Sequence, residues 1–215
     1  MSAEQDFFSI VVLGAMNPRI HHPTWYRLVG LISEQEEQQA LESGLLVTPP
    51  VAQFQCPGFV VLCQEERWEV QTNRSELFVR LRDLTSRVFD ELLNHTPLNR
   101  YGFNFDYVRS TEAPDVAKLL AQAIVSLPLG LRAGNAAAGE IVLRRYEDDH
   151  TIAVTLRPFE STAVKVASNF DYTTPGTKGF FNLRDRIESR HPIDHAEAVE
   201  QTAEIVSAIN HMAGK

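Results

Sequence analysis

Cysteine is scarce in this sequence: only Cys56 and Cys63 occur in 215 residues. Two thiols cannot build the disulfide framework of a small secreted protein, and a zinc finger would need a second pair of Cys or His residues. Both lie on the apolar side of alternating segments, so we expect them to be reduced and structural. This cysteine usage favours a reducing, cytoplasmic compartment.

Long hydrophobic runs are absent as well. The apolar run near the start, at 7–16, is about half of what a membrane-spanning helix needs. Glu4 and Asp6 precede it, where a signal peptide would carry basic residues. We therefore expect neither membrane insertion nor secretion.

Basic charge is limited: 20 Lys and Arg stand against 28 Asp and Glu, a formal net charge of −8. Neither half of the chain is basic, so binding to the phosphates of a nucleic acid is disfavoured. The 44% of hydrophobic and 22% of charged residues are typical of a globular chain that can bury a sizeable core.

The best-defined catalytic motifs are missing too. The sequence has no Gly-x4-Gly-Lys-Ser/Thr phosphate loop, no strand-linked Gly-x-Gly-x-x-Gly, no His-Glu-x-x-His and no Gly-x-Ser-x-Gly. These absences favour a non-catalytic protein without a bound cofactor or metal. An enzyme whose site is assembled from distant residues would leave no such motif.

The hydrophobic pattern predicts strands by its period of two and helices by its period of about 3.6. The expected strands are 7–14, a meander within 51–72, 101–107, 140–146, 151–159 and 162–172. The expected helices are a short capped one opened by Ser33 and Glu36, then 77–92, 116–127 and a closing helix. Meanders separated by helices predict an α+β fold with antiparallel strands packed against long amphipathic helices.

The domain organisation is open between two readings. Each half has a strand meander followed by a long amphipathic helix, which suggests two similar halves. A single α+β domain over 1–215 fits the sequence, and so do subdomains 1–129 and 140–215 joined by the Gly- and Ala-rich segment 130–139.

The densest polar segment directly follows the first strand and supplies the predicted interaction residues, Arg19, His21, His22, Trp25 and Tyr26. Loops that leave a rigid strand often carry function, and aromatic residues and Arg dominate binding at interfaces. Alternatively, Arg19 binds a carboxylate or phosphate and a histidine of loop 19–22 transfers protons or ligates a metal, in a small-ligand-binding protein or enzyme. In a third interpretation the segment has only a structural role, as a loop stiffened by proline with exposed imidazoles.

A second histidine pair, His191 and His195, has the spacing of one helical face, with Asp194 beside it. This arrangement fits a metal site or an acid–base group. Pro192 and the spacing of Asp194 to Glu197 instead predict that Asp194 caps a helix that begins near His195. We prefer the capping interpretation.

The strand at 101–107 alternates Tyr101, Phe103, Phe105 and Tyr107 with other residues. Together with Gly102, its two phenylalanines resemble the RNP1 strand of RNA-recognition motifs, in which rings stack on bases, at three of eight positions. That resemblance implies an RNA-binding module. We expect instead that the four rings face the helix at 77–92.

The preferred hypothesis for function is a protein-interaction or assembly protein that binds a protein partner or associates with itself. Strand meanders leave sheet edges that must be protected, and pairing with another chain is one way to protect them. The ligand-binding or enzymatic role of loop 19–22 is the alternative, and RNA binding through the aromatic strand is less favoured.

Overall fold

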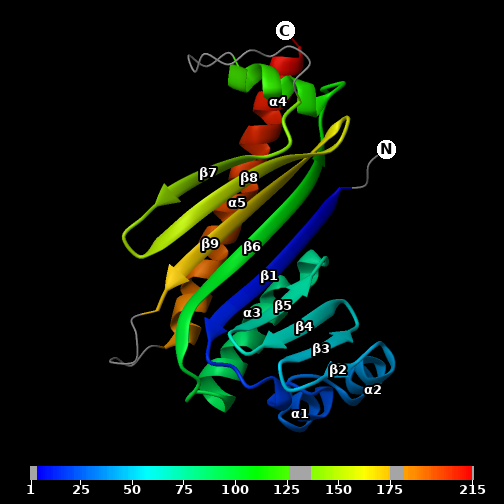
Figure 1. Ribbon diagram of the computed structural model, residues 1–215, viewed down its shortest axis with the longest axis vertical. Coiled ribbons are helices and arrows are strands. Elements are labelled where there is room, and N and C mark those ends of the chain that lie inside the picture. The colour runs from blue at the N-terminus through cyan, green and yellow to red at the C-terminus, as the bar shows by residue number, and fades with distance from the viewer. Residues whose placement is uncertain (1–3, 126–136, 175–181, 215) are drawn as a thin grey trace.

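The computed structural model describes residues 4–125, 137–174 and 182–214. A single nine-stranded antiparallel sheet runs through these ranges in the order β2-β3-β4-β5-β1-β6-β9-β8-β7 (Figure 1). The strands are β1 (Gln5–Gly14), β2 (Leu46–Val47), β3 (Val51–Cys56), β4 (Phe59–Gln64), β5 (Arg67–Thr72), β6 (Leu98–Ser110), β7 (Ile141–Tyr146), β8 (His150–Glu160) and β9 (Ala163–Thr173). The predicted α+β class with an antiparallel sheet is confirmed.

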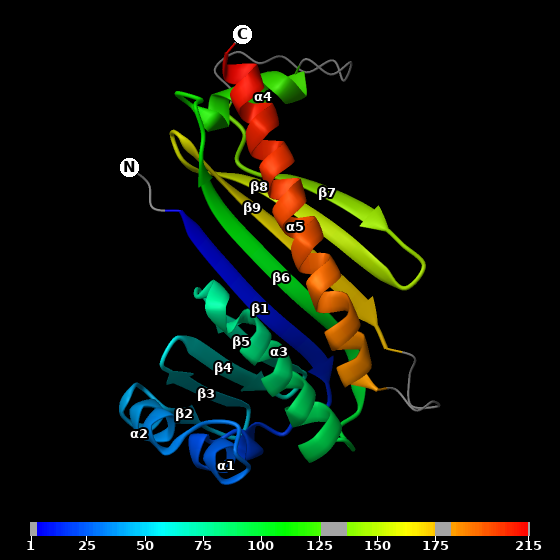
Figure 2. The same cartoon turned by 180° about the vertical axis from the view of Figure 1, so that it is seen from behind.

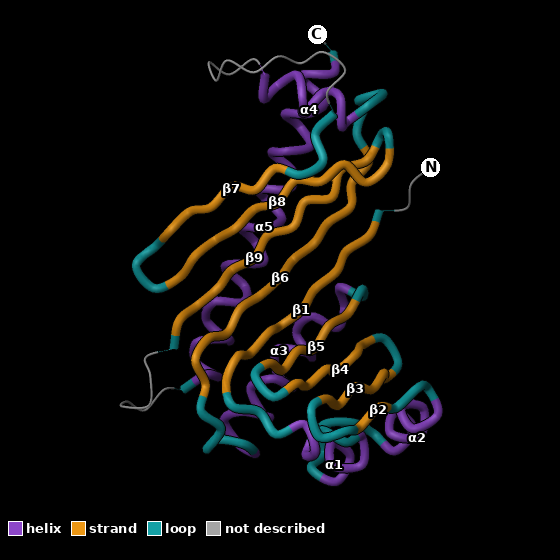
Figure 3. Tube along the Cα trace, viewed as in Figure 1, coloured by secondary structure: helices purple, strands orange, loops and turns teal. Residues whose placement is uncertain are grey.

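The helices gather on one face of this sheet. They are α1 (Pro23–Leu28), α2 (Glu34–Glu42), α3 (Phe78–Ser86), α4 (Val116–Val125) and α5 (Leu183–Ala213), with short helical turns η1 (Pro18–Ile20), η2 (Ser75–Leu77) and η3 (Arg87–Leu92). Figure 2 shows α3 and α5 crossing in front of the strands. From the opposite side, in Figures 1 and 3, no helix of the described ranges covers β1, β6, β9 or β8.

Alternation along the central strands explains this layering. Phe8 of β1 lies opposite Phe105 of β6, which lies opposite Ser168 of β9. Side chains at every second position from these residues therefore point at the helices and form the core. The positions between them, such as Ser9 and Asn104, line the open face.

Helix α3 packs over β1 and β5 rather than directly over β6. Its Phe78 ring lies 4.6 Å from the ring of Phe8 and 6.4 Å from that of Phe105. Most of the helical cover of β6 comes from α5. The predicted packing of the 77–92 helix on the aromatic strand is seen in the contact between Phe78 and Phe105, and the last part of that helix is the π-helical η3.

The closing helix begins earlier than the sequence predicted, and this prediction was wrong. Helix α5 is 31 residues long, starts at Leu183 after an Asn182 N-cap, and contains Pro192. Asp194 is buried in the middle of the helix and bonds a tyrosine instead of a backbone amide.

The segment after β1 was predicted to be a loop, but it contains short helices. Pro23 does not prevent helix formation there, because it occupies the first turn of α1, where proline is well tolerated.

Cys56 and Cys63 are both free and fully buried, as predicted. Burial raises the pKa of each thiol to about 12, so both stay protonated at neutral pH. The predicted connection at 130–139 falls largely outside the described residues. Among the residues placed, no helix is long and apolar enough to cross a membrane.

Candidate functional site

The predicted interaction residues occupy different environments. Arg19 is exposed, whereas His21 and Tyr26 are buried and joined by a hydrogen bond of 2.8 Å between Nδ1 and the hydroxyl. The Tyr26 hydroxyl also accepts a hydrogen bond of 3.0 Å from Nε1 of Trp68 on β5. This three-residue chain ties the segment after β1 to the sheet.

The remaining two residues of that segment act locally. His22 caps α1, since its Nδ1 accepts a hydrogen bond from the backbone N–H of Thr24. The half-buried Trp25 ring packs edge-on against Tyr26, with centroids 5.0 Å apart. Arg19 and the exposed parts of His22 and Trp25 are the atoms that could meet a partner, and the interaction role of the five residues stays a prediction.

Burial also decides what His21 can do chemically. Desolvation lowers its pKa to about 4, so the imidazole is neutral at physiological pH. The same effect raises the pKa of Tyr26. A buried neutral His21 that already bonds Tyr26 has a structural role in this geometry.

The rings of the β6 aromatic strand face the helices. Tyr101, Phe103, Phe105 and Tyr107 are all buried. Stacking on nucleic-acid bases needs exposed rings, and these rings contact one another and α5 instead.

A cluster of polar aromatic side chains that sequence reasoning missed lies across β6, β9 and β8. The ring of Tyr172 stacks on Tyr101 at 4.9 Å and on His150 at 4.7 Å, and the Arg190 guanidinium lies 5.5 Å from its centroid. The Tyr172 hydroxyl donates a 2.7 Å hydrogen bond to Oδ2 of Asp194. The strand register brings Tyr101, Tyr172 and His150 together, the packing of α5 adds Arg190 and Asp194, and no sequence spacing signals either arrangement.

The carboxyl group of this cluster is strongly perturbed. Asp194 is 2% exposed, and burial raises its pKa to about 6. It therefore exchanges a proton near neutral pH, which is a property of acid–base groups and of buried structural carboxyls alike.

The histidine pair of α5 lies in an aromatic environment. The ring of His191 is 5.2 Å from Phe8 and 5.7 Å from Phe103, and its Nε2 is buried without a hydrogen-bond partner among the described residues. Burial and the neighbouring His195 lower the pKa of His191 to about 4. Within the described ranges, no group of three His, Cys, Asp or Glu side chains could hold a metal ion.

The open face of the sheet carries a row of amides. Asn104 donates a hydrogen bond of 2.9 Å to the Ser9 hydroxyl, and Asn169 donates one of 2.5 Å to Asn104. Further along the same face, Lys165 and Asp106 form an ion pair of 2.6 Å. These bonds satisfy the polar groups of the central strands where no described helix covers them.

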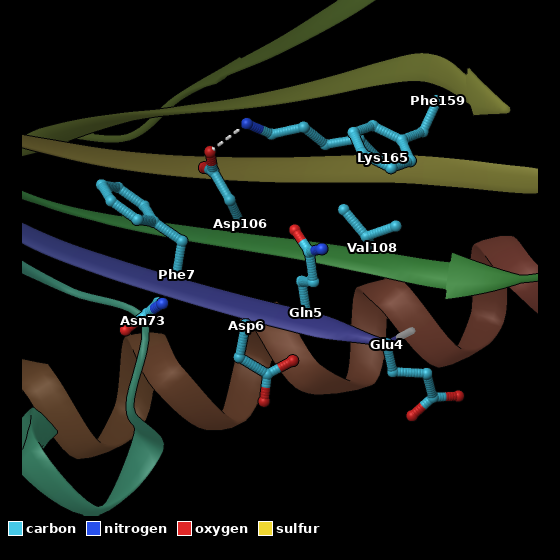
Figure 4. Close-up of a pocket in the computed structure, with 9 residues that line it drawn as sticks. All are labelled: Glu4, Gln5, Asp6, Phe7, Asn73, Asp106, Val108, Phe159 and Lys165. Carbon is cyan, nitrogen blue, oxygen red and sulfur yellow. Dashed lines mark ion pairs between the residues drawn. The ribbon is translucent and has the colours of Figure 1, made fainter. Parts of the chain in front are cut away.

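A hollow of about 430 Å³ lies at one end of this face. Figure 4 shows Phe7, Asp106 and Lys165 rising from neighbouring strands, with Phe159 close to Lys165. Besides the Asp106–Lys165 pair, the polar side chains of Glu4, Gln5, Asp6 and Asn73 share the lining with the two phenyl rings, so the hollow offers a partner a mixed polar and apolar surface.

Strand β7 forms one edge of the sheet. It pairs with β8, and within the described ranges it pairs with no other strand. Leu143 is 60% exposed and Tyr146 is 75% exposed. The opposite edge, β2, has two residues, so β7 is the longer of the two edges.

An acidic groove of about 790 Å³ runs between β7 and α5. Arg145 of β7 pairs with Glu197 at 2.7 Å, and Glu200, Glu204 and the exposed Ile193 continue the lining along α5. The edge strand is thus flanked by an apolar and acidic helix surface.

No protein-family model and no curated protein matches this chain. The geometry of the chain itself therefore has to indicate its function.

Proposed function

We propose that this protein is a non-catalytic assembly protein that associates with itself through β7. The observation that carries the proposal is the exposure of Leu143 and Tyr146 on a six-residue edge strand. An edge strand with unpaired backbone groups is a template for pairing with another chain. Exposed apolar side chains beside such an edge favour burial in an interface.

The sequence of β7 suits antiparallel pairing with a second copy. Residues that oppose each other in an antiparallel pair lie on the same face, so a two-fold axis at Leu143 places this residue opposite its own copy. Val142 then lies opposite Arg144, and Ile141 lies opposite Arg145. The central contact joins two leucines, and no like charges oppose each other.

The charges of α5 support the same register. Ile141 packs in a cluster that contains Ile205 of α5, so this part of β7 lies beside the segment of α5 that carries Glu204. Arg145 of the second copy, opposite Ile141, would approach that carboxylate. Each copy would supply one such arginine and one such glutamate, as two-fold symmetry requires.

The finer expectations from the sequence belong to this proposal as well. The chain order of elements supports two similar halves: β1 precedes α1, α2, the meander β2–β5 and α3, and β6 precedes α4, the meander β7–β9 and α5. Each of β1 and β6 pairs with the last strand of the meander that follows it. In this interpretation β1 and β6 join the halves at the centre of the sheet. Free, buried cysteines support a cytoplasmic location.

Sedimentation of purified protein over a wide concentration range tests the self-association. We expect a dimer that Leu143→Glu converts to a monomer, since the substitution places two carboxylates opposite each other. Leu28→Glu is the matched control, because Leu28 is 69% exposed but lies on α1. A wild-type monomer at every concentration, or a Leu143→Glu variant that associates normally, would contradict the proposal.

A further inference from the structure

A groove of about 490 Å³ lies on the helix face, between α5 and the ends of β1 and β6. Figure 2 shows α5 running across this part of the sheet. The volume falls within the range of about 300–1,000 Å³ that is usual for small-molecule sites. The lining residues on the strand side include Tyr107 and Arg109, and those on α5 include Val199, Ala203 and Val206.

Tyr107 supplies a polar group that lacks a partner. Its side chain is 2% exposed, and its buried hydroxyl makes no hydrogen bond within the described part of the chain. Burial raises the pKa of Tyr107, so the hydroxyl is neutral and can donate. A buried hydroxyl without a partner is unfavourable, and a bound molecule with an acceptor atom would relieve this cost.

Arg109 offers further donors over the ring of Tyr107. Its guanidinium lies 4.9 Å from the centroid of the Tyr107 ring. The bonds of this guanidinium to Asp6, at 2.7 Å, and to the backbone carbonyls of Val108, at 2.9 Å, and Gln5, at 3.4 Å, all use Nη1. Nε and Nη2 make no other bond to the described residues, so they remain for a ligand.

The α5 side of the groove is apolar at its centre. Val199, Ala203 and Val206 are spaced four and three residues apart, so they lie on one face of the helix. Val199 is exposed although it is apolar. A ligand with a hydrocarbon part would cover this stripe.

The charges around the groove limit the polar part of the ligand. Among the described residues of the lining, Arg109 is the one cation and Glu4 the one anion. Asp6 faces Arg109 from β1, and the lining residues of α5 are uncharged. A carboxylate would meet the repulsion of Glu4 and Asp6, and an amine would meet that of Arg109. An uncharged acceptor avoids both.

We propose that this groove binds a small uncharged amphipathic molecule. Its carbonyl or amide oxygen accepts hydrogen bonds from Arg109 and Tyr107, and its apolar part lies on Val199, Ala203 and Val206. This site is separate from the β7 edge, so it does not depend on self-association.

Octanamide, octanoate and octylamine are suitable probes, because they share a hydrocarbon chain and differ in head-group charge. Methyl NMR of the valine-labelled full chain reports their binding. We expect saturable shifts of the Val199 and Val206 methyl signals with octanamide, and weaker binding of the two charged probes. Absence of saturable shifts, or tighter binding of octanoate or octylamine, would overturn the proposal.

Tyr107→Phe separates ligand binding from a structural role of the hydroxyl. This variant should bind octanamide about three- to tenfold more weakly, the effect of losing one hydrogen bond. Its thermal midpoint should be equal to or above that of the wild type, because no bond within the protein is lost. Tyr146→Phe, at an exposed tyrosine of β7, is the matched control and should bind normally. Unchanged affinity of Tyr107→Phe would refute the assigned role.

Discussion

Asp90 and Leu183 are joined by a hydrogen bond across 93 residues: Oδ1 of the carboxylate accepts the backbone N–H of Leu183 at 3.1 Å. Asp90 lies in η3, and Leu183 is the first residue of α5. The bond therefore joins the start of α5 to η3, the helical turn that follows α3. The side chain of Asn182 accepts the backbone N–H of Asp185, so two side chains satisfy two of the free amides at this helix end.

We expect Asp90→Ala to lower the free energy of unfolding by roughly 0.5–2 kcal/mol, the usual effect of removing a helix cap. Asp90→Asn should lose less. Its amide oxygen still accepts the bond, and the change removes a carboxyl whose pKa burial raises. Urea unfolding followed by circular dichroism measures both variants. Equal losses for the two would show that the charge, not the acceptor, matters.

Tyr26→Phe and Tyr107→Phe remove the same atom and should have opposite outcomes. Loss of the Tyr26 hydroxyl leaves Nε1 of Trp68 and Nδ1 of His21 without a partner. Each unsatisfied buried group costs about 1–3 kcal/mol, so Tyr26→Phe should be clearly destabilising. Tyr107→Phe should be neutral or stabilising. Unfolding free energies of the two variants give the comparison, and a similar change in both would contradict it.

Stability should fall in acid because of His21 and His191. Their folded pKa values are lowered from 6.5 to about 4, so the unfolded chain binds protons first. Their contribution is complete above pH 6.5 and is lost as the pH falls toward 4. Each histidine changes the unfolding free energy by about 1.4 kcal/mol per pH unit in this window. Urea unfolding from pH 4 to 8 tests this, with His191→Phe expected to flatten the profile. An equally steep profile for that variant would count against a neutral His191.

Asp194 should act in the opposite direction. Its folded pKa is raised from 3.8 to about 6, so the folded protein binds the proton first, and stability decreases as the pH rises through this range. Asp194→Asn keeps an acceptor for Tyr172 and removes the buried charge. We expect this variant to be as stable as the wild type or more so at pH 7, and to lose stability more steeply below pH 6. A marked loss at pH 7 would instead indicate that the carboxylate is needed in its ionised form.

The strands were the most predictable part of the fold. Alternation marked β3–β5 and β6, which bury one face against helices, and a run of β-branched and aromatic residues marked β1. β7–β9 were predicted as strand-like runs, although most residues of β7 are exposed, and the capping-box spacing of Ser33 and Glu36 marked α2. Strand β2 was not predicted, because a strand of two residues is too short to show a hydrophobic period. The start of α5 was misplaced because Pro192 and Asp194 imitate a helix beginning, whereas tertiary contacts hold the helix together across the proline.

The candidate sites were less predictable for a physical reason. His21 and Tyr26 were assigned to a surface, yet both are buried, because Tyr26 bonds Trp68 on β5 and His21 bonds Tyr26. The column of Tyr101, Tyr172 and His150 depends on the register of three strands, and the orphan hydroxyl of Tyr107 depends on how α5 crosses β6. Local patterns carry no information on either arrangement.

The position of β6 between β1 and β9 has a consequence for folding kinetics. β6 meets β1 through Ser9 and Asn104, 95 residues apart, and meets β9 through Asn104 and Asn169, 65 residues apart. Such non-local pairings require large loops to close, which slows folding. While the chain is being synthesised, β1 and β5 can pair early, but the other side of β1 stays open until β6 emerges. Until then the side of β1 that later pairs with β6 is an unpaired strand edge of the nascent chain. A chaperone or another copy of the chain could bind this edge.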